Sequence, residues 1–267
     1  MKVSIIIVNY NGKNYLTDCL ASVLKTNVNF FEVIVVDNAS SDGSVEKLNK
    51  RVKLIRSKTN LFFTGGCNLG AKKAKGEWLV FLNPDTVVEP DWLTELVKEA
   101  KDKKLTLQPK IKIYGTDRID CVIGKYFWPG FGIAIGRGKA DKYERIIKGD
   151  YANGTCLMIN KNWFWHLGGF DENFKFFYED ADLQLRAKKQ GGRAIGVMKA
   201  VIYHKGSLSF KQNMVRDEMV FYYRRNRLVT VLKNFSGFER WVRWGLLAGV
   251  SLVSGRLKMS IKAVLMR

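Results

Sequence analysis

The chain has few cysteines for its length, and they are scattered. Its 267 residues include only four, Cys19, Cys67, Cys121 and Cys156, and none forms a C-x-x-C pair. This spacing is typical neither of a structural zinc site nor of a dense disulfide framework. Cys19 falls on the apolar face of an expected helix, so we interpret it as a core residue. Reduced thiols and a cytoplasmic protein are therefore expected.

Long hydrophobic runs and two nucleotide-binding motifs are also missing. The apolar run at residues 1–8 is too short for the hydrophobic region of a signal peptide, and no small-residue cleavage site follows it. The longest late apolar stretch, residues 244–255, falls short of the roughly 20 residues that cross a bilayer, so no transmembrane helix is expected. No G-x-G-x-x-G follows the first expected strand, and no P-loop pattern occurs. These absences argue against a dinucleotide-binding Rossmann protein and exclude a P-loop protein.

Acidic residues are scarce relative to basic ones. The chain carries 45 Lys and Arg against 25 Asp and Glu, a net charge of +20. Such a charge implies an anionic partner: nucleic acid, acidic lipid headgroups or a phosphorylated substrate. No nucleic-acid-binding motif occurs, so we expect no nucleic acid among the partners. The apolar fraction of 46% is ordinary for a globular protein with one large domain or two small ones.

Strand and helix patterns alternate through the first half of the chain. The expected strands span residues 3–8, 32–36, 52–55 and 77–82. Three helices are expected in this half. The first starts after a cap at Asn14, the second runs through Val45 and Leu48, and the third covers residues 69–74 after a glycine-containing loop at 60–68. This alternation predicts a parallel sheet with helices on both faces. Polar turns follow three of the strands, which predicts a nucleotide crevice at their carboxyl ends.

The expected strand at 77–82 ends in Asn83-Pro84-Asp85, and the rest of the chain is organised around this turn. Pro84 cannot donate to a strand ladder, so the strand stops here. Asp85 then follows the carboxyl end of a central strand, where open α/β sheets bind their ligands. Its carboxylate could hold a divalent cation that bridges to phosphate oxygens. It could equally cap the next helix or form an Asx-turn, and this stretch alone leaves both interpretations open.

The regular pattern weakens beyond residue 103. Residues 104–150 are typical of irregular, glycine-rich connections, where we expect an acceptor-side or lid element. Strands are expected again at 155–159, 194–197 and 201–203, and a helix at 161–167. Glu179, Asp180 and Asp182 precede another expected helix. By themselves, these three carboxylates fit a helix N-terminus as well as a catalytic site.

Six separated motifs occur in a fixed order along the chain. They are S-I-I-I-V-N-Y-N-G at 4–12, V-V-D-N-A-S-S-D-G-S at 35–44, L-N-P-D-T at 82–86, G-F-D-E at 169–172, Y-E-D-A-D-L at 178–183 and His204. In this order they resemble the inverting glycosyltransferases of sequence family 2, which have the GT-A fold, over roughly residues 3–235. Within the family, the chain is most similar to rhamnosyltransferase-like members of bacteria and archaea. Asn83 replaces the first acidic residue of the usual D-x-D, and Phe62 stands where relatives commonly carry glycine.

The resemblance implies an α/β GT-A fold, Rossmann-like with a mostly parallel central sheet and helices on both faces. It implies a hexosyl- or deoxyhexosyl-transferase that moves a sugar from a nucleotide-diphosphate sugar to a glycan or lipid-linked acceptor, in polysaccharide biosynthesis. Asp180 would be the general base with Glu179 in support, and Asp85 and His204 would be ligands of Mg²⁺ or Mn²⁺. The resemblance further implies a nucleotide-sugar site that consists of Val8, Asn9, Tyr10, Asn11, Asp37, Asn38, Ser40, Asn60, Gly65, Asn68, Asn83 and Asp85.

The C-terminal region differs from the rest in composition. We expect a catalytic domain at 1–210, with a nucleotide-binding half at 1–103 and an acceptor or catalytic half at 104–210, and then a basic amphipathic helical region at 211–267. Basic and aromatic residues alternate there with apolar residues at helical spacing. The pattern fits an interfacial membrane anchor, or a helix packed on the catalytic domain or on a partner. We expect peripheral attachment at the anionic inner face of the cell membrane.

Two other classes of function remain open at this point. One is a non-catalytic basic module that binds a membrane or a polyanion, for which a steep salt dependence of binding is expected. The other is a nucleotidyltransferase on a similar α/β sheet, which releases pyrophosphate instead of a nucleoside diphosphate.

Overall fold

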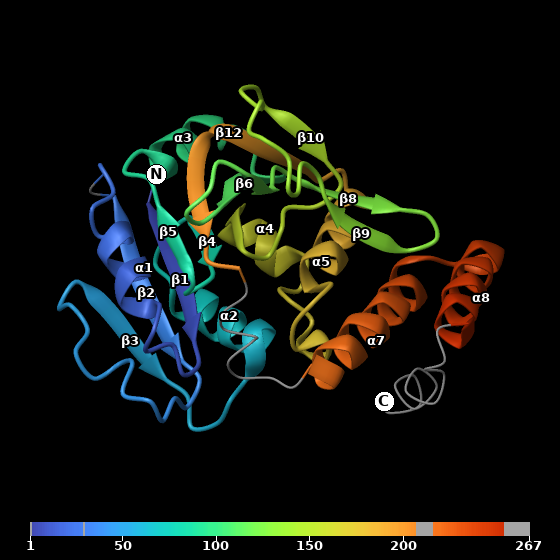
Figure 1. Cartoon of the computed structure of the whole chain (residues 1–267), viewed down its shortest axis with the longest axis horizontal. Helices are drawn as coiled ribbons and strands as arrows, with labels where there is room; N and C mark the ends of the chain where they lie inside the picture. The colour runs from blue at the N-terminus through green and yellow to red at the C-terminus, as the bar shows by residue number, and fades with distance from the viewer. Residues whose placement is uncertain (1, 29, 207–215, 254–267) are drawn as a thin grey trace.

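The computed structural model describes residues 2–28, 30–206 and 216–253 (Figure 1). The predicted alternation of the first half is confirmed by β1 (Val3–Asn9), α1 (Leu16–Val23), β2 (Phe31–Asp37), β3 (Val52–Arg56), α2 (Phe62–Lys73) and β4 (Trp78–Leu82). These four strands are parallel and lie in the order β4-β1-β2-β3. Every residue of β1 and β4 is buried, which explains their unbroken apolar pattern.

The second half of the chain extends the same sheet. Its elements are β5 (Thr86–Val88), α3 (Trp92–Glu99), β6 (Leu105–Ile113), β7 (Ile119–Cys121), β8 (Gly124–Phe127), β9 (Phe131–Ala134), β10 (Ile147–Gly149), β11 (Cys156–Asn160), α4 (Lys161–His166), η1 (Glu172–Phe174), α5 (Glu179–Lys188) and β12 (Arg193–His204). The sheet order is β10-β12-β6-β11-β4-β1-β2-β3, with β5 on β12 and β7 on β6, while β8 and β9 form a separate hairpin. The sheet is mixed because β11 runs antiparallel to β4 and β6. Both predicted halves of the catalytic domain therefore share one sheet.

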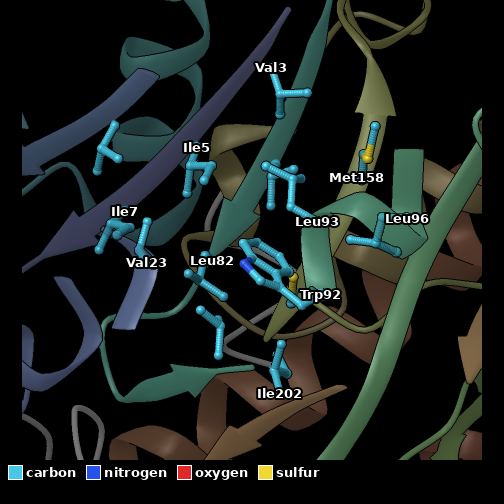
Figure 2. Packing of buried hydrophobic residues seen from close by; sticks show 14 of the residues in the cluster. Val3, Ile5, Ile7, Val23, Leu82, Trp92, Leu93, Leu96, Met158 and Ile202 are labelled. Atoms are coloured by element: carbon cyan, nitrogen blue, oxygen red, sulfur yellow. The ribbon is translucent and has the colours of Figure 1, made fainter. Parts of the chain in front are cut away.

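The sheet is buried on both faces, as the alternation predicted. Alternate residues of β1 belong to different hydrophobic clusters: Ile5 and Ile7 pack with α1 and α3, whereas Ile6 and Val8 pack with α2, α4 and α5. Figure 2 shows the first cluster, with Trp92 of α3 among its members. All four cysteines are buried and free, and the prediction that Cys19 is a core residue is confirmed.

Two predictions near the crevice are wrong. The expected loop at 60–68 forms the first turns of α2, which begins at Phe62. A Cβ on Gly66 would lie 2.7 Å from Val8, so close packing on β1 requires glycine here despite its low helix propensity. The expected helix through Val45 and Leu48 is a series of turns. Asp42 accepts a hydrogen bond from the Ser44 amide at 3.0 Å, and the Glu46 and Val52 amides close short turns on the carbonyls of Gly43 and Asn49.

The prediction that residues 104–150 are irregular is also wrong, because β6, β7, β8, β9 and β10 lie there. The acceptor-side or lid role expected for this stretch stays a prediction. Polar residues interrupt the apolar pattern of β6, but distant partners satisfy them: Lys110 pairs with Asp141 at 2.8 Å, and Gln108 donates to the Cys121 carbonyl at 3.4 Å. The two strands expected at 194–197 and 201–203 form the single strand β12, with a shift in its register on β6 between Val197 and Val201.

The expected helical character of the C-terminal region is confirmed by α7 (Arg216–Asn234) and α8 (Gly237–Val253). The α7 helix is tied to α5, because Asp182 accepts hydrogen bonds from Lys233 at 3.0 Å and Asn234 at 2.8 Å. The predicted domain boundary at 210 lies outside the described residues, as do the basic residues beyond α8, namely Arg256, Lys258, Lys262 and Arg267. Among the helices that the structure describes, none is long and apolar enough to cross a membrane.

Candidate active site

A cavity of about 410 Å³ opens at the carboxyl ends of the central strands. Val8, Asn38 and Asn83 line it from the ends of β1, β2 and β4, and the opposite wall comes from β9, the start of α5 and α7. Eight predicted site residues line the cavity: Val8, Tyr10, Asn38, Asn60, Asn83, Glu179, Asp180 and His204. Seven lie off its wall: Asn9, Asn11, Asp37, Ser40, Gly65, Asn68 and Asp85.

Strand pairing brings Asp85 and His204 together from distant parts of the chain. β12 runs antiparallel to β5, with His204 opposite Thr86, and the Lys205 amide donates to the Asp85 carbonyl at 2.9 Å. As a result, Nε2 of His204 lies 3.4 Å from Oδ1 of Asp85. The other ring nitrogen, Nδ1, lies 2.7 Å from Oδ2 of Asp120 on β7. Sequence reasoning missed Asp120, because only the pairing of β7 with β6 places this isolated carboxylate in the site.

The two carboxylates beside His204 differ in their hydrogen bonding. Asp85 is fully buried, and within the described part of the chain neither of its oxygens accepts a hydrogen bond beyond the His204 contact. Burial alone would lower the pKa of His204, but hydrogen bonds to Asp120 and Asp85 and the charges of both carboxylates raise it to about 9. Burial of a carboxylate without donors is costly unless a cation compensates. At this pKa the protonated His204 ring itself supplies the compensating positive charge, and a metal ion bound by Asp85 and His204 would take the place of the proton on Nε2.

The carboxylate and imidazole at this place suit a divalent cation such as Mg²⁺ or Mn²⁺ only with further ligands. In the described ranges, no group of three or more His, Cys, Asp or Glu side chains could hold a metal ion by itself. Mg²⁺ commonly binds proteins through one or two carboxylates together with substrate phosphates. Asp85 and His204 fit that kind of site, in which the ligand completes the coordination.

A second pair of carboxylates, Glu179 and Asp180, begins α5 and lines the same cavity. Burial raises the pKa of Asp180 to about 6, although hydrogen bonds from the Gly154 and Ala181 amides favour its charged form and the side chain keeps some exposure to the cavity. Burial and the charge of Asp180 raise the pKa of Glu179 well above its usual value. A carboxylate with a pKa near 6 is suited to take a proton near neutral pH.

The loop before α5 has an uncommon backbone. Lys175, Phe177 and Tyr178 all have φ values between 61° and 67°, a region in which non-glycine residues cost free energy and which is often found at functional sites. Asn226 of α7 is fully buried, and its Nδ2 donates to the carbonyls of Phe174 at 2.7 Å, Phe176 at 2.7 Å and Phe177 at 3.0 Å. The α7 helix thus holds the loop that positions Asp180. Sequence reasoning missed Asn226, which has no motif of its own.

The predicted nucleotide-side residues that lie off the cavity wall brace those that line it. Asn9 donates to Ser40 at 3.1 Å, and Ser40 also accepts from the Asn11 amide at 3.0 Å. Asp37 is buried, accepts from the Ser40 amide at 3.2 Å and lies 3.7 Å from Arg56. These contacts join the segment after β1, which includes Tyr10, to the segment after β2, which includes Asn38, so that both residues are held at the cavity. Direct contact of Asp37 with a nucleotide stays a prediction.

The start of α2 supplies the remaining predicted residues. Asn60 lines the cavity and accepts from the Phe62 amide at 2.8 Å. Asn68 and Gly65 lie on α2, off the cavity wall. The Asn68 side chain donates to the Phe170 carbonyl at 2.8 Å and accepts from the Phe170 amide at 3.1 Å. These bonds favour a structural role for Asn68 over ligand binding. Phe62 has φ 57°, a conformation that glycine adopts without strain. Phe62 lines the cavity, and the centroid of its ring lies 4.4 Å from Nζ of Lys175.

Several known proteins are similar to this chain in sequence. The family model described as "Glycosyl transferase family 2" matches residues 4–168. The N-acetylglucosaminyl-diphospho-decaprenol L-rhamnosyltransferase of Mycobacterium tuberculosis is 26% identical over 234 residues, which cover 75% of each protein. The O-antigen biosynthesis protein RfbC of Myxococcus xanthus is 28% identical over 81% of this chain but only 18% of its own length. The chain likewise spans 25% of the uncharacterized protein y4gI of Sinorhizobium fredii, at 26% identity over 238 residues.

Solved structures show the same fold. The crystal structure of GalNAc-T7 with UDP, GalNAc and Mn²⁺ has a TM-score of 0.66 and 19% identity, over 95% of this chain and 57% of that one. The mannosyltransferase PcManGT from Pyrobaculum calidifontis, in complex with GDP-Man and Mn²⁺, has a TM-score of 0.64 and 15% identity, over 98% of this chain and 73% of that one. The predicted GT-A fold is therefore confirmed.

Proposed function

This chain belongs to glycosyl transferase family 2, and from that membership we propose that it moves a sugar from a nucleotide-diphosphate sugar to a glycan or lipid-linked acceptor, with inversion. The observation that carries the proposal is that one cavity is lined by His204, with the buried Asp85 directly behind it, and by the carboxylates of Glu179 and Asp180. Asp85 with His204 lies at the end of β4, and Asp180 with Glu179 lies at the start of α5. The pair of Asp85 and His204 would bind a cation beside the diphosphate, and the pair of Asp180 and Glu179 would take the proton of an acceptor hydroxyl.

Asp180 would act as the general base. It would take the proton of the acceptor hydroxyl while the acceptor oxygen forms a bond to the anomeric carbon, on the face opposite the diphosphate. The bond between that carbon and the diphosphate oxygen breaks, and its electron pair leaves with the nucleoside diphosphate. Glu179, whose pKa is held well above its usual value by burial and by the charge of Asp180, would stay protonated beside Asp180, which leaves a single negative charge in the pair.

Asp85 and His204 would hold Mg²⁺ or Mn²⁺ together with the diphosphate oxygens. When bound, the cation supplies positive charge that stabilises the departing diphosphate. Asp120 would fix the orientation of the His204 ring through its bond to Nδ1, a common role of a carboxylate behind a metal-bound histidine. The Mn²⁺ in the two solved structures supports this part of the proposal.

The relatives support the substrate class. The Mycobacterium tuberculosis relative is named as a rhamnosyltransferase that acts on a diphospho-decaprenol sugar, which supports a hexosyl or deoxyhexosyl donor and a lipid-linked acceptor. The name of RfbC supports a role in polysaccharide biosynthesis. We place the reaction in the cytoplasm, at the inner face of the cell membrane, where activated donors and lipid-linked acceptors can meet.

The identity of the released product tests the proposal. The protein is incubated with a panel of nucleotide sugars, Mn²⁺ and candidate acceptors, and the products are separated by chromatography. We expect release of a nucleoside diphosphate that depends on the acceptor and is lost in Asp180→Asn. Release of pyrophosphate would instead identify a nucleotidyltransferase. If no nucleotide sugar is consumed while polyanions bind with a steep salt dependence, the non-catalytic binding module would replace the enzyme.

A further inference from the structure

The α8 helix has two apolar faces, and only one of them is covered. Leu247 is fully buried and packs with Leu228 and Val231 of α7, and Trp244 packs against the same cluster. The other face carries Phe238, Trp241 and Leu246, whose exposed fractions are 85%, 61% and 43%. Residues three, four, seven and eight positions apart share one face of a helix. Phe238 and Trp241 are three positions apart and therefore share one face of α8, and Leu246, eight positions after Phe238 but five after Trp241, lies at the border of that face.

The glycines of α8 show that this face borders open space. A Cβ built on Gly245 or Gly249 would meet no atom of the described residues within 4 Å. Gly245 lies four positions after Trp241 and seven after Phe238, so it belongs to the same face. In the described ranges, then, no other element covers this side of α8.

A second exposed aromatic pair lies on the β8–β9 hairpin. Phe127 and Trp128 at its tip have exposed fractions of 48% and 59%. The hairpin is fixed to α8, because Arg243 donates to the Pro129 carbonyl at 3.2 Å. Figure 1 shows the hairpin and α8 at the same end of the molecule. We call Phe127, Trp128, Phe238, Trp241 and Leu246 together the apolar edge.

The amino-acid sequence of the C-terminal region is strongly basic. Between residues 216 and 267 there are 11 Lys and Arg but only three Asp and Glu. The sequence that follows α8, residues 254–267, contains Arg256, Lys258, Lys262 and Arg267 and no acidic residue. Tryptophan and phenylalanine flanked by basic residues are typical of segments that lie in the boundary between lipid headgroups and acyl chains. A second copy of this chain would bring an equally positive surface, and the two would repel each other.

We propose that the apolar edge inserts into the headgroup region of an anionic lipid bilayer, with Arg240 and Arg243 of α8 facing the headgroups. This assigns particular side chains, from two separate elements, to the membrane contact. The hairpin and α7 also line the cavity, through Gly132, Ala134 and Tyr223. Docking at this edge would therefore bring the acceptor side of the cavity to the bilayer. That last step rests on the proposed function, whereas the docking itself does not.

Vesicle co-sedimentation of the full chain tests the proposal. We expect binding to vesicles that contain about 30% phosphatidylglycerol in phosphatidylcholine, weak binding to pure phosphatidylcholine, and weaker binding as salt rises. The double variant Phe238→Ser/Trp241→Ser should lose at least about tenfold in affinity, because two large apolar side chains no longer enter the lipid. Trp128→Ser should also weaken binding. The control is Tyr114→Ser, which removes an aromatic side chain that is 50% exposed on the turn after β6.

Three results would overturn the proposal. They are a wild-type protein that does not bind anionic vesicles, a double variant that binds them as the wild type does, and sedimentation velocity data in which the wild type is a dimer and the double variant a monomer. The last would show that a second copy covers the edge. Thermal shifts with nucleotides in the same variants separate this proposal from the proposed function, because the edge variants should keep the wild-type shift.

Discussion

Asp180→Asn is expected to lower kcat by about 10²–10⁴-fold, the usual contribution of a general base, while leaving metal-dependent nucleotide binding unchanged. The reason is that Asp180 lines the cavity at the start of α5, whereas the cation site is at Asp85 and His204. Steady-state kinetics and nucleotide titrations on the same preparation check both parts. Glu144→Gln, which changes an exposed carboxylate off the cavity wall, is the matched control and should behave as the wild type. Full activity in Asp180→Asn would contradict the assignment of the base.

The raised pKa of Asp180 predicts a pH dependence of activity in the wild type that Asp180→Asn should lack. In the wild type, kcat/KM should rise with pH through an apparent pKa of about 6, which belongs to the Glu179–Asp180 pair, and then level off.

The same raised pKa predicts how stability depends on pH, because the pKa of Asp180 in the folded protein lies above the unfolded value of 3.8. The folded state therefore gains stability as pH falls through about 6, and this gain is complete below the unfolded pKa. The melting temperature of the wild type should approach or overtake that of Asp180→Asn on acidification from pH 7.5 to 5. A constant difference would show that Asp180 titrates normally.

Asn226→Leu is expected to lower kcat about 100-fold although Asn226 does not line the cavity. The substitution leaves three carbonyls, those of Phe174, Phe176 and Phe177, without their donor. Each unsatisfied buried group costs about 1–3 kcal/mol. The residues of the loop that adopt the left-handed backbone conformation also lose the hydrogen bonds that stabilise that conformation. A displacement of Asp180 by about 1 Å is enough for a loss of this size. Kinetics measured beside metal-dependent nucleotide binding should show a fall in kcat with the binding retained.

The control for Asn226 is an asparagine with no such role. Asn162 is exposed on α4, and Asn162→Leu should leave kcat unchanged. Circular dichroism separates a local change from global unfolding, since Asn226→Leu should keep its helical signal while its melting temperature falls. Wild-type kcat in a folded Asn226→Leu protein would mean that other contacts hold the loop.

The central strands could be predicted because their burial leaves a direct mark on the sequence. β1 and β4 are buried along their whole length, so their apolar runs have the signature of parallel strands covered on both faces. The end of β4 also drew attention to Asp85, since such sheets bind ligands there, but only the family resemblance favoured a ligand role over a helix cap. β6 was missed because Lys110 and Gln108 break its pattern, and their partners are far away in the sequence.

The site was only partly predictable, because much of it depends on pairings between distant segments. Asp180 and His204 came from motifs, but Asp120 reaches His204 only through the β6–β7 pairing. Asn226 reaches the loop before α5 only because α7 packs there. Asn68 matched a motif position, yet its amide is occupied by Phe170. Sequence spacing alone carries no information on any of these contacts.

The most direct test of the account is the thermal stability of the protein with nucleoside diphosphates, with and without Mn²⁺ or Mg²⁺. A ligand at about 100 times its Kd adds about 2.7 kcal/mol, which raises the melting temperature by several degrees for a chain of this size. We predict a metal-dependent shift with one nucleoside that is lost in Asp85→Ala and retained in Asp180→Asn. An undiminished shift in Asp85→Ala, or no shift with any nucleotide, would contradict a cation-assisted nucleotide site at Asp85.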